Sequence, residues 1–138
     1  MKLVNKEIII RKVRNEDAIQ YIDLHNLVWR YAYKNIFPEE VFLEKESRRL
    51  DKIKKFPEVH FNDNTTLCYV AEVDNEIIGF IYGKIKSDYQ HFKDLNYADL
   101  VGLYIHPDYQ RKGIANKFRQ IFVEWLKKIK LMNMLLEF

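Results

Sequence analysis

The run LYIHPDYQRKGIA, residues 103–115, reads as a strand, a turn and a basic loop that ends at Gly113. An amphipathic helix is expected to begin there, and the first turn of a helix has unpaired N–H groups and a partial positive charge. Gly113 and the small Ala115 let the backbone approach an anion closely. Arg111 and Lys112 add positive charge at the same place. This order of residue types predicts a phosphate-binding loop.

The loop alone is weak evidence, because many helices that bind nothing also begin after a strand, a glycine and a basic residue. The longer run 98–115, however, closely resembles the acetyl-CoA motif of the GNAT superfamily of acetyltransferases. The family pattern is Arg or Gln, two residues, Gly, one residue, then Gly or Ala. Gln110, Gly113 and Ala115 match this pattern.

The resemblance continues upstream of the motif. IIIRKVRNED, residues 8–17, is similar to the family's first strand and helix cap, and YVAEVDNEIIGFIYG, residues 69–83, is similar to its central hairpin. WRYAYKNIFPEEVF, residues 29–42, resembles the helices on the acceptor side of many bacterial-type members. The resemblance therefore implies an N-acetyltransferase that uses acetyl-CoA, with a small-molecule or peptide amine as the acceptor.

The resemblance also implies roles for two groups of residues. The backbone of the fourth strand would hydrogen-bond the pantetheine arm and thioester of acetyl-CoA, and the loop amides would hold the pyrophosphate. The strand residues are Leu103, Tyr104 and Ile105, and the loop residues are Gln110, Arg111, Lys112, Gly113, Ile114 and Ala115. The acceptor amine would approach from the opposite side, over the first two helices.

Acetyl transfer requires a deprotonated amine, and a lysine-type amine has a pKa of about 10.4. Asp99 is the candidate base, because some family members place a catalytic glutamate at the start of the fourth strand. Aspartate is one methylene shorter and would act through water; the alternative is a solvated acid at a strand end. Glu72 is a second candidate, with a polar strand position as its alternative. No tyrosine in the sequence can be identified as the acid that protonates CoA.

Hydrophobic periodicity predicts the elements that position these residues. A strand is expected over 7–13, a helix over 16–32 capped by Asn15, and a second helix that starts at Pro38 and directs Val41, Phe42, Leu50 and Ile53 inward. Strands at 66–73 and 77–86 flank a polar turn, with Gly79 and Gly83 indicating a bulge or close backbone approach. A polar loop over 88–97, a strand over 98–105, a helix from Gly113 to about 130 and a strand over 131–138 complete the list.

The expected order is β-α-α-β-β-β-α-β, an α/β fold with a mixed sheet in one domain, residues 1–138. It resembles the GNAT acyl-CoA N-acyltransferase fold without its usual final helix and strands. A strand over 131–138 would then present an apolar edge with unpaired backbone groups. We therefore expect a homo-oligomer that forms through this C-terminal strand.

Composition excludes several other classes of protein. The net charge of +3 is too small for a nucleic-acid-binding face, and no apolar run approaches the ~20 residues that span a bilayer. Cys68 is the single cysteine, and the N-terminal residues do not resemble a signal peptide, so a cytoplasmic protein is expected. The four histidines have no metal-ligand spacing, and no metal site is predicted. The charged run that contains Lys45 and Lys52 is interpreted as a solvated helix face.

Two functions remain open at this stage. The first is an acetyl-CoA-dependent N-acetyltransferase. The second is a non-catalytic CoA-binding or assembly module of the same fold, in which the short C-terminus has removed turnover. An intact cofactor loop is compatible with both.

Overall fold

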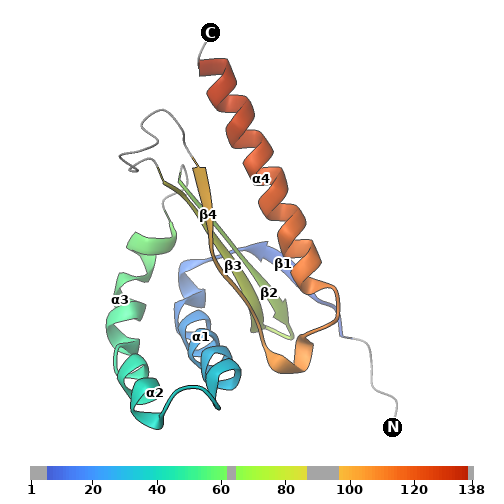
Figure 1. Cartoon of the computed structure of the whole chain (residues 1–138). Coiled ribbons are helices and arrows are strands. Elements are labelled where there is room, and N and C mark those ends of the chain that lie inside the picture. Colours follow the sequence, from blue (N-terminus) through green and yellow to red (C-terminus); the bar gives the residue numbers. More distant parts are fainter. Residues whose placement is uncertain (1–5, 62–64, 87–96, 137–138) are drawn as a thin grey trace.

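Four strands pair in chain order into an antiparallel sheet in the computed structural model, which describes residues 6–61, 65–86 and 97–136. They are β1 (Ile9–Lys12), β2 (Thr66–Val73), β3 (Glu76–Lys86) and β4 (Tyr97–Ile105). Helices α1 (Ala18–Tyr33), α2 (Glu39–Glu46) and α3 (Arg49–His60) lie on one side of the sheet, and α4 (Ile114–Leu136) crosses the other (Figure 1). The predicted α/β architecture is confirmed, and residues 87–96 of the predicted polar loop lie outside the described part.

Each face of the sheet has its own apolar core. On the α1–α3 side, Tyr21 and Val28 of α1 pack with Phe56 of α3 and Phe80 of β3. On the α4 side, Ile114 and Phe118 pack on inward residues that include Ile81 and Ile105. Alternate residues of each strand face opposite sides, so β3 and β4 supply both cores.

The turn between β2 and β3 is the predicted polar hairpin turn. Asp74 and Asn75 have φ angles of 50° and 67°, the left-handed pair that a two-residue turn between twisted strands requires. Gln20 of α1 fixes this turn to the helix layer: its Nε2 donates to Asn75 O over 3.3 Å, and its Oε1 accepts from Ile77 N over 2.8 Å. The hairpin and the first helix are therefore held together.

The entry to α1 is organised by Asp17 rather than by the predicted cap, Asn15. A 3-10 turn over Asn15–Asp17 precedes the helix, and Asp17 Oδ2 accepts a hydrogen bond from Arg14 N over 2.7 Å. Arg11 of β1 donates to both oxygens of the same carboxylate, over 2.8 and 2.9 Å. Asp17 thus links the first strand to the first helix.

The single helix predicted from Pro38 is two helices in the structure. Pro38 precedes α2, which ends at Glu46, where Ser47 Oγ donates back to Glu44 O and offers the backbone an alternative to helical bonding. The break changes the helical phase. Phe42 is buried as predicted, whereas Leu50 is 75% exposed and its predicted inward position is wrong.

The strand predicted over 131–138 is wrong, because α4 continues to Leu136. Residues 131–136 are Leu, Met, Asn, Met, Leu and Leu, with no Gly or Pro to end the helix and no β-branched residue to favour a strand. The described sheet is consequently antiparallel throughout rather than mixed. The expected homo-oligomer loses the edge strand on which it was based.

Gly79 and Gly83 of β3 lie where α4 approaches the sheet closely, as predicted. A Cβ at Gly83 would be 2.9 Å from the Phe122 ring, and one at Gly79 would be 3.4 Å from the Phe118 ring. The β3–β4 register also shifts between Tyr82 and Gly83, which pair with Gly102 and Leu100. Glycine lets the helix sit directly on the strand at the bulge.

Candidate active site

One backbone and one side-chain hydrogen bond hold the predicted cofactor loop against the sheet. His106 N donates to Ile78 O over 2.7 Å, which anchors the chain as it leaves the sheet. Gln110 Nε2 donates to Ile105 O over 3.0 Å, so this side chain bridges the loop and the strand end. Between them lies a short 3-10 turn, Pro107–Tyr109. The loop is therefore held in one position relative to β4.

The loop turns sharply through two left-handed residues. Arg111 has a φ of 62° and Gly113 a φ of 85°. A Cβ added at Gly113 would meet no atom within 4 Å. Glycine is thus required there by its backbone angle, and the space in front of it is open.

Several backbone amides of this turn have no partner among the described residues. Gln110 N donates to Pro107 O, and Lys117 N donates to Gly113 O. The N–H groups of residues 111–115, which lie between Gln110 and Lys117, donate to no acceptor among the described residues. Free amides around left-handed residues at the start of a 23-residue helix form a concave site that suits an anion.

Beside this loop, β4 is the outer strand of the described sheet. Leu103, Tyr104 and Ile105 pair with Ile81, Phe80 and Gly79 of β3 on the inner side only. The outer edge of β4 can therefore offer backbone N–H and C=O groups to an extended ligand. The loop and this edge adjoin, so the predicted cofactor-binding residues do lie together.

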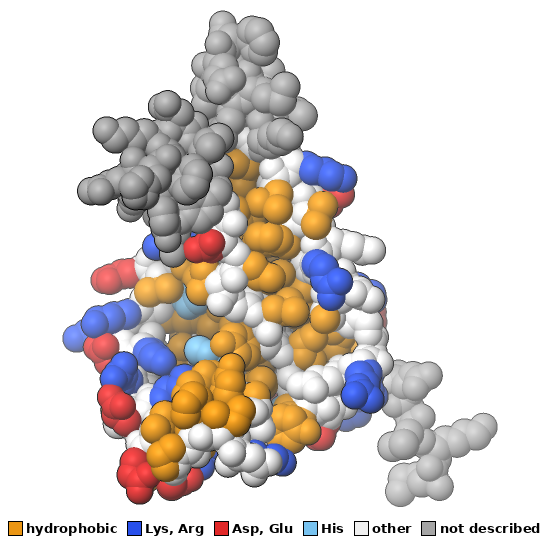
Figure 2. Space-filling view, in the orientation of Figure 1, with side chains coloured by type: hydrophobic (Ala, Val, Ile, Leu, Met, Phe, Trp, Pro, Cys, Tyr) orange, Lys and Arg blue, Asp and Glu red, His pale blue; other side chains and the backbone are white. Residues whose placement is uncertain are grey.

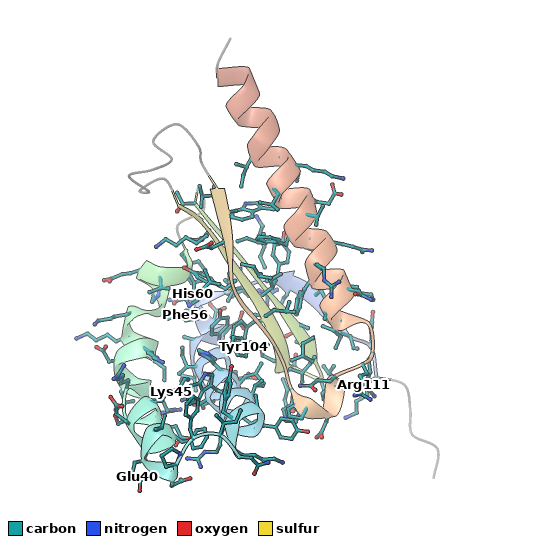
Figure 3. All side chains as sticks on the ribbon, viewed as in Figure 1. Glu40, Lys45, Phe56, His60, Tyr104 and Arg111 are labelled. Carbon is teal, nitrogen blue, oxygen red and sulfur yellow. The ribbon has the colours of Figure 1, made fainter. Side chains whose placement is uncertain are left out.

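The side chain of Tyr104 faces the opposite way from the loop, toward α1. Its ring lies 4.5 Å from the His25 ring and 5.2 Å from the Phe80 ring, centroid to centroid. Burial, with a contribution from Tyr33, raises the pKa of Tyr104, so its hydroxyl keeps its proton at neutral pH. Leu103 and Ile105 instead pack on the α4 side. Figure 3 shows Tyr104 between Lys45 of α2 and the loop that contains Arg111.

His25 is a site residue that the sequence analysis missed. Burial, together with the charges of Lys45 and Lys52, lowers its pKa to about 4, so the imidazole is neutral at pH 7. His25 is four residues after Tyr21 and three before Val28, both buried in α1. That helical spacing was the signal that could have placed His25 on the inward stripe.

Asp99, the predicted base, lies near the start of β4 opposite Lys84 of β3. Tyr82, two residues before Lys84, contacts His60 of α3 at 4.5 Å between ring centroids. Residues two apart in a strand share a face of the sheet, so Lys84 lies on the same face as Tyr82. Directly opposed residues of paired strands also share a face, so Asp99 lies on the α1–α3 face with Tyr104. Asp99 is half-buried. Its role as a base stays a prediction.

Glu72 and Cys68 lie outside this arrangement. Arg11 Nη2 donates to Glu72 Oε2 over 3.1 Å, which makes Glu72 a polar strand position in an ion-pair network. Cys68 is buried, and burial raises the pKa of its thiol to about 12. A protonated thiol in the core is a poor nucleophile.

A cavity of about 650 Å³ lies elsewhere, between β1, β2 and α4, and its lining includes Lys12, Lys117 and Trp125. None of the predicted cofactor-binding residues lines it. In the described ranges, no three His, Cys, Asp or Glu side chains group as metal ligands would. A helix with the length and hydropathy of a membrane span is also absent from those ranges.

Comparison with known proteins agrees with this geometry. The model of the acetyltransferase (GNAT) family matches residues 21–137, so the chain belongs to the GNAT family of acetyltransferases. A spermidine N(1)-acetyltransferase of Thermoplasma acidophilum is 31% identical over 108 residues, which cover 77% of this chain and 62% of that protein. An N-alpha-acetyltransferase of Sulfurisphaera tokodaii is 25% identical over 90% of this chain and 65% of that protein. The chain thus spans less than two thirds of the length of these curated relatives.

Solved structures show the same fold. The PaiA N-acetyltransferase from Thermoplasma acidophilum, crystallised with coenzyme A, has a TM-score of 0.73 and 26% identity, with 90% of this chain and 74% of that chain covered. The aminoglycoside N-acetyltransferase AAC(6')-Iy, also in complex with CoA, has a TM-score of 0.64 and 16% identity, with 93% and 74% covered. The second similarity is one of fold alone.

Proposed function

We propose that this chain is an N-acetyltransferase that transfers the acetyl group of acetyl-CoA to the amine of a small molecule or peptide. The supporting observation is the set of free amides at residues 111–115, arranged around Arg111 and Gly113 beside the open edge of β4. Two solved structures of this fold hold coenzyme A, which fits a pyrophosphate at this loop. The free amides of 111–115 would hold the pyrophosphate, and the backbone of Leu103, Tyr104 and Ile105 would hold the pantetheine arm.

The acceptor amine would approach over the α1–α3 face, where Tyr104 and His25 meet. Its nitrogen attacks the thioester carbonyl carbon, and a base takes up the proton of the amine. The carbon–sulfur bond then breaks, and CoA leaves as a thiolate that is protonated to the free thiol. Asp99 is the candidate for that base, acting through water. A strand N–H near Leu103 is the candidate donor to the tetrahedral oxyanion.

The test is to incubate the full chain with acetyl-CoA and a panel of amines, with free thiol release and product mass as the readouts. We expect thiol release that depends on the amine and rises with pH, because only the neutral amine reacts. Asp99→Asn should lower kcat without weakening acetyl-CoA binding, and Asp99→Glu should retain activity. An Asp99→Asn variant with unchanged kcat would remove Asp99 from the mechanism.

A second candidate function is a non-catalytic CoA-binding or assembly module of the same fold. The favouring observation is that α4 continues over residues where a further strand was expected. Calorimetry distinguishes the two functions: acetyl-CoA binding without acetylation of any amine supports the module. Failure to bind acetyl-CoA would overturn both.

A further inference from the structure

Lys45 of α2 is half-buried between helices rather than solvated. Its Nζ donates to Asn26 Oδ1 of α1 over 2.7 Å and lies 5.3 Å from the centre of the Trp29 ring. Burial and the charge of Lys52 lower the pKa of Lys45 to about 8, so it remains mainly protonated at neutral pH. The interpretation of this run as a uniformly solvated face is therefore wrong at Lys45.

Most of the acids on the same three helices are paired with other cations: Asp23, Glu39, Glu44, Glu46 and Asp51. Arg30 donates to Glu39 and Glu46 with distances of 2.8–2.9 Å, and Arg49 donates to Asp23. Two further pairs are Arg48–Glu44 and Lys55–Asp51. In the described part of the chain, neither Lys45 nor Lys52 forms an ion pair with a carboxylate. The charge of Glu46 acts on Lys45 but is outweighed there by that of Lys52, so the two lysines together remain positive.

The charges of both lysines act on His25, the residue that contacts Tyr104. They are the two largest charge contributions at His25, and both disfavour its protonation. Figure 2 shows His side chains in a hollow among hydrophobic side chains, with Lys and Arg side chains on the helix side of it. In Figure 3, Lys45 and Tyr104 lie on the two sides of this region, and Arg111 of the cofactor loop lies well away from it. The local field on the acceptor side is thus positive and separate from the loop.

We propose that the acceptor is a small amine that also bears an anionic group, a carboxylate or a phosphate, which Lys45 and Lys52 bind beside His25 and Tyr104. This inference rests on the proposed function. A positive, partly desolvated pocket attracts an anion and repels a second cationic centre. Spermidine, for which one relative is named, is consequently expected to be a poor acceptor for this chain.

The experiment compares acceptors that differ only in the anionic group: glucosamine with glucosamine 6-phosphate, and tyramine with tyrosine, with spermidine as the polycation. We expect kcat/KM to be at least tenfold higher for the anionic member of one pair, and lowest for spermidine. The phosphate and carboxylate pairs identify which anion the site takes. Equal values within both pairs, or spermidine as the best acceptor, would overturn the inference and leave the acetyltransferase proposal intact.

Variants of the two lysines test their role directly. Lys45→Gln and Lys52→Gln should each reduce the preference within the favoured pair about tenfold, mainly through KM, and Lys52→Arg should retain it. Lys54→Gln, on the exposed face of α3, is the matched control and should change nothing. If the Gln variants weaken acetyl-CoA binding instead, the lysines belong to the cofactor site and the inference fails.

Anion binding at the two lysines can also be measured without turnover. Inorganic phosphate added to the full chain should raise the pKa of His25, followed by NMR of its Cε1 proton, because an anion at the two lysines offsets their charge. Lys45→Gln should diminish that rise, and Lys54→Gln should not. No response of His25 to phosphate would contradict the inference. Acetylation of no amine at all, with acetyl-CoA bound, would overturn both this inference and the proposed function.

Discussion

The imidazole ring of His25 on α1 lies 4.5 Å from the phenol ring of Tyr104 on β4, centroid to centroid. The contact joins the first helix to the strand whose backbone is the candidate thioester site. It places a neutral nitrogen base and a protonated hydroxyl on the face from which an acceptor would approach. The predictions below test the groups that build this arrangement.

Stability should fall as the pH drops below neutrality, because two histidines are held neutral. Burial lowers the pKa of His60 to about 4, as burial and nearby lysines do for His25. The unfolded chain binds a proton near pH 6.5 and the folded chain does not, so unfolding is favoured progressively from pH 6.5 to 4. His60 alone should cost about 2 kcal/mol at pH 5 relative to pH 7.

His60→Phe tests this directly, since the new ring keeps the contacts with Phe56, Tyr21 and Tyr82. His60 Nδ1 is buried and has no hydrogen-bond partner among the described residues, so no bond is lost there. Urea unfolding should give equal or greater stability at pH 7 and a clear gain at pH 5. A variant as acid-sensitive as the wild type would show that His60 is not held neutral.

Gly83→Ala should destabilise the fold by about 1–3 kcal/mol through overpacking. The new methyl would be 2.9 Å from the Phe122 ring and 3.3 Å from the Trp125 ring, so these rings or the helix that carries them must shift. Thermal unfolding measures the loss. The double variant Gly83→Ala with Phe122→Leu should recover part of it, because the smaller side chain makes room. Strictly additive losses would argue against this contact as the cause.

Asp17→Asn should cost about 2–4 kcal/mol, because it breaks the paired hydrogen bonds from Arg11 and leaves a largely buried guanidinium short of a partner. Burial alone would raise the pKa of Asp17, but Arg11 and the Arg14 amide outweigh it and lower that pKa. This contribution is therefore present above the ordinary carboxylate pKa and is lost as pH falls through the lowered value. Glu72→Gln, which loses one 3.1 Å contact, is the milder comparison in urea unfolding.

Gly113→Glu should abolish acetyl-CoA binding measured by calorimetry, because it puts a carboxylate into the open space before the free amides. Gly113→Gln carries the same bulk and the same strain from the φ of 85° without the charge. We expect the Gln variant to bind more weakly than wild type and the Glu variant at least tenfold more weakly than Gln. Wild-type affinity in the Glu variant would remove this loop from the cofactor site.

Features that depend on neighbouring residues were readable from the sequence. The turn at Asp74 and Asn75 needs left-handed angles that these residues tolerate, and Gly113 after a basic run indicated the start of α4. Gly79 and Gly83 in a strand indicated a close approach, which the structure places under Phe118 and Phe122. Each of these signals lies within a few residues of the feature it predicts.

Tertiary structure decided the features that depend on distant partners. The break between α2 and α3 turned Leu50 outward, and the sequence from Leu131 favoured helix continuation over a strand once α4 was established. Whether a lysine is solvated depends on which groups the packing brings to it. That Lys45 and Lys52 form no ion pair with a carboxylate among the described residues followed only from the assembled helices. The contact of His25 with Tyr104 likewise requires α1 to lie across β4, because side chains far apart in sequence meet only when burial of both faces of the sheet fixes the helices upon it.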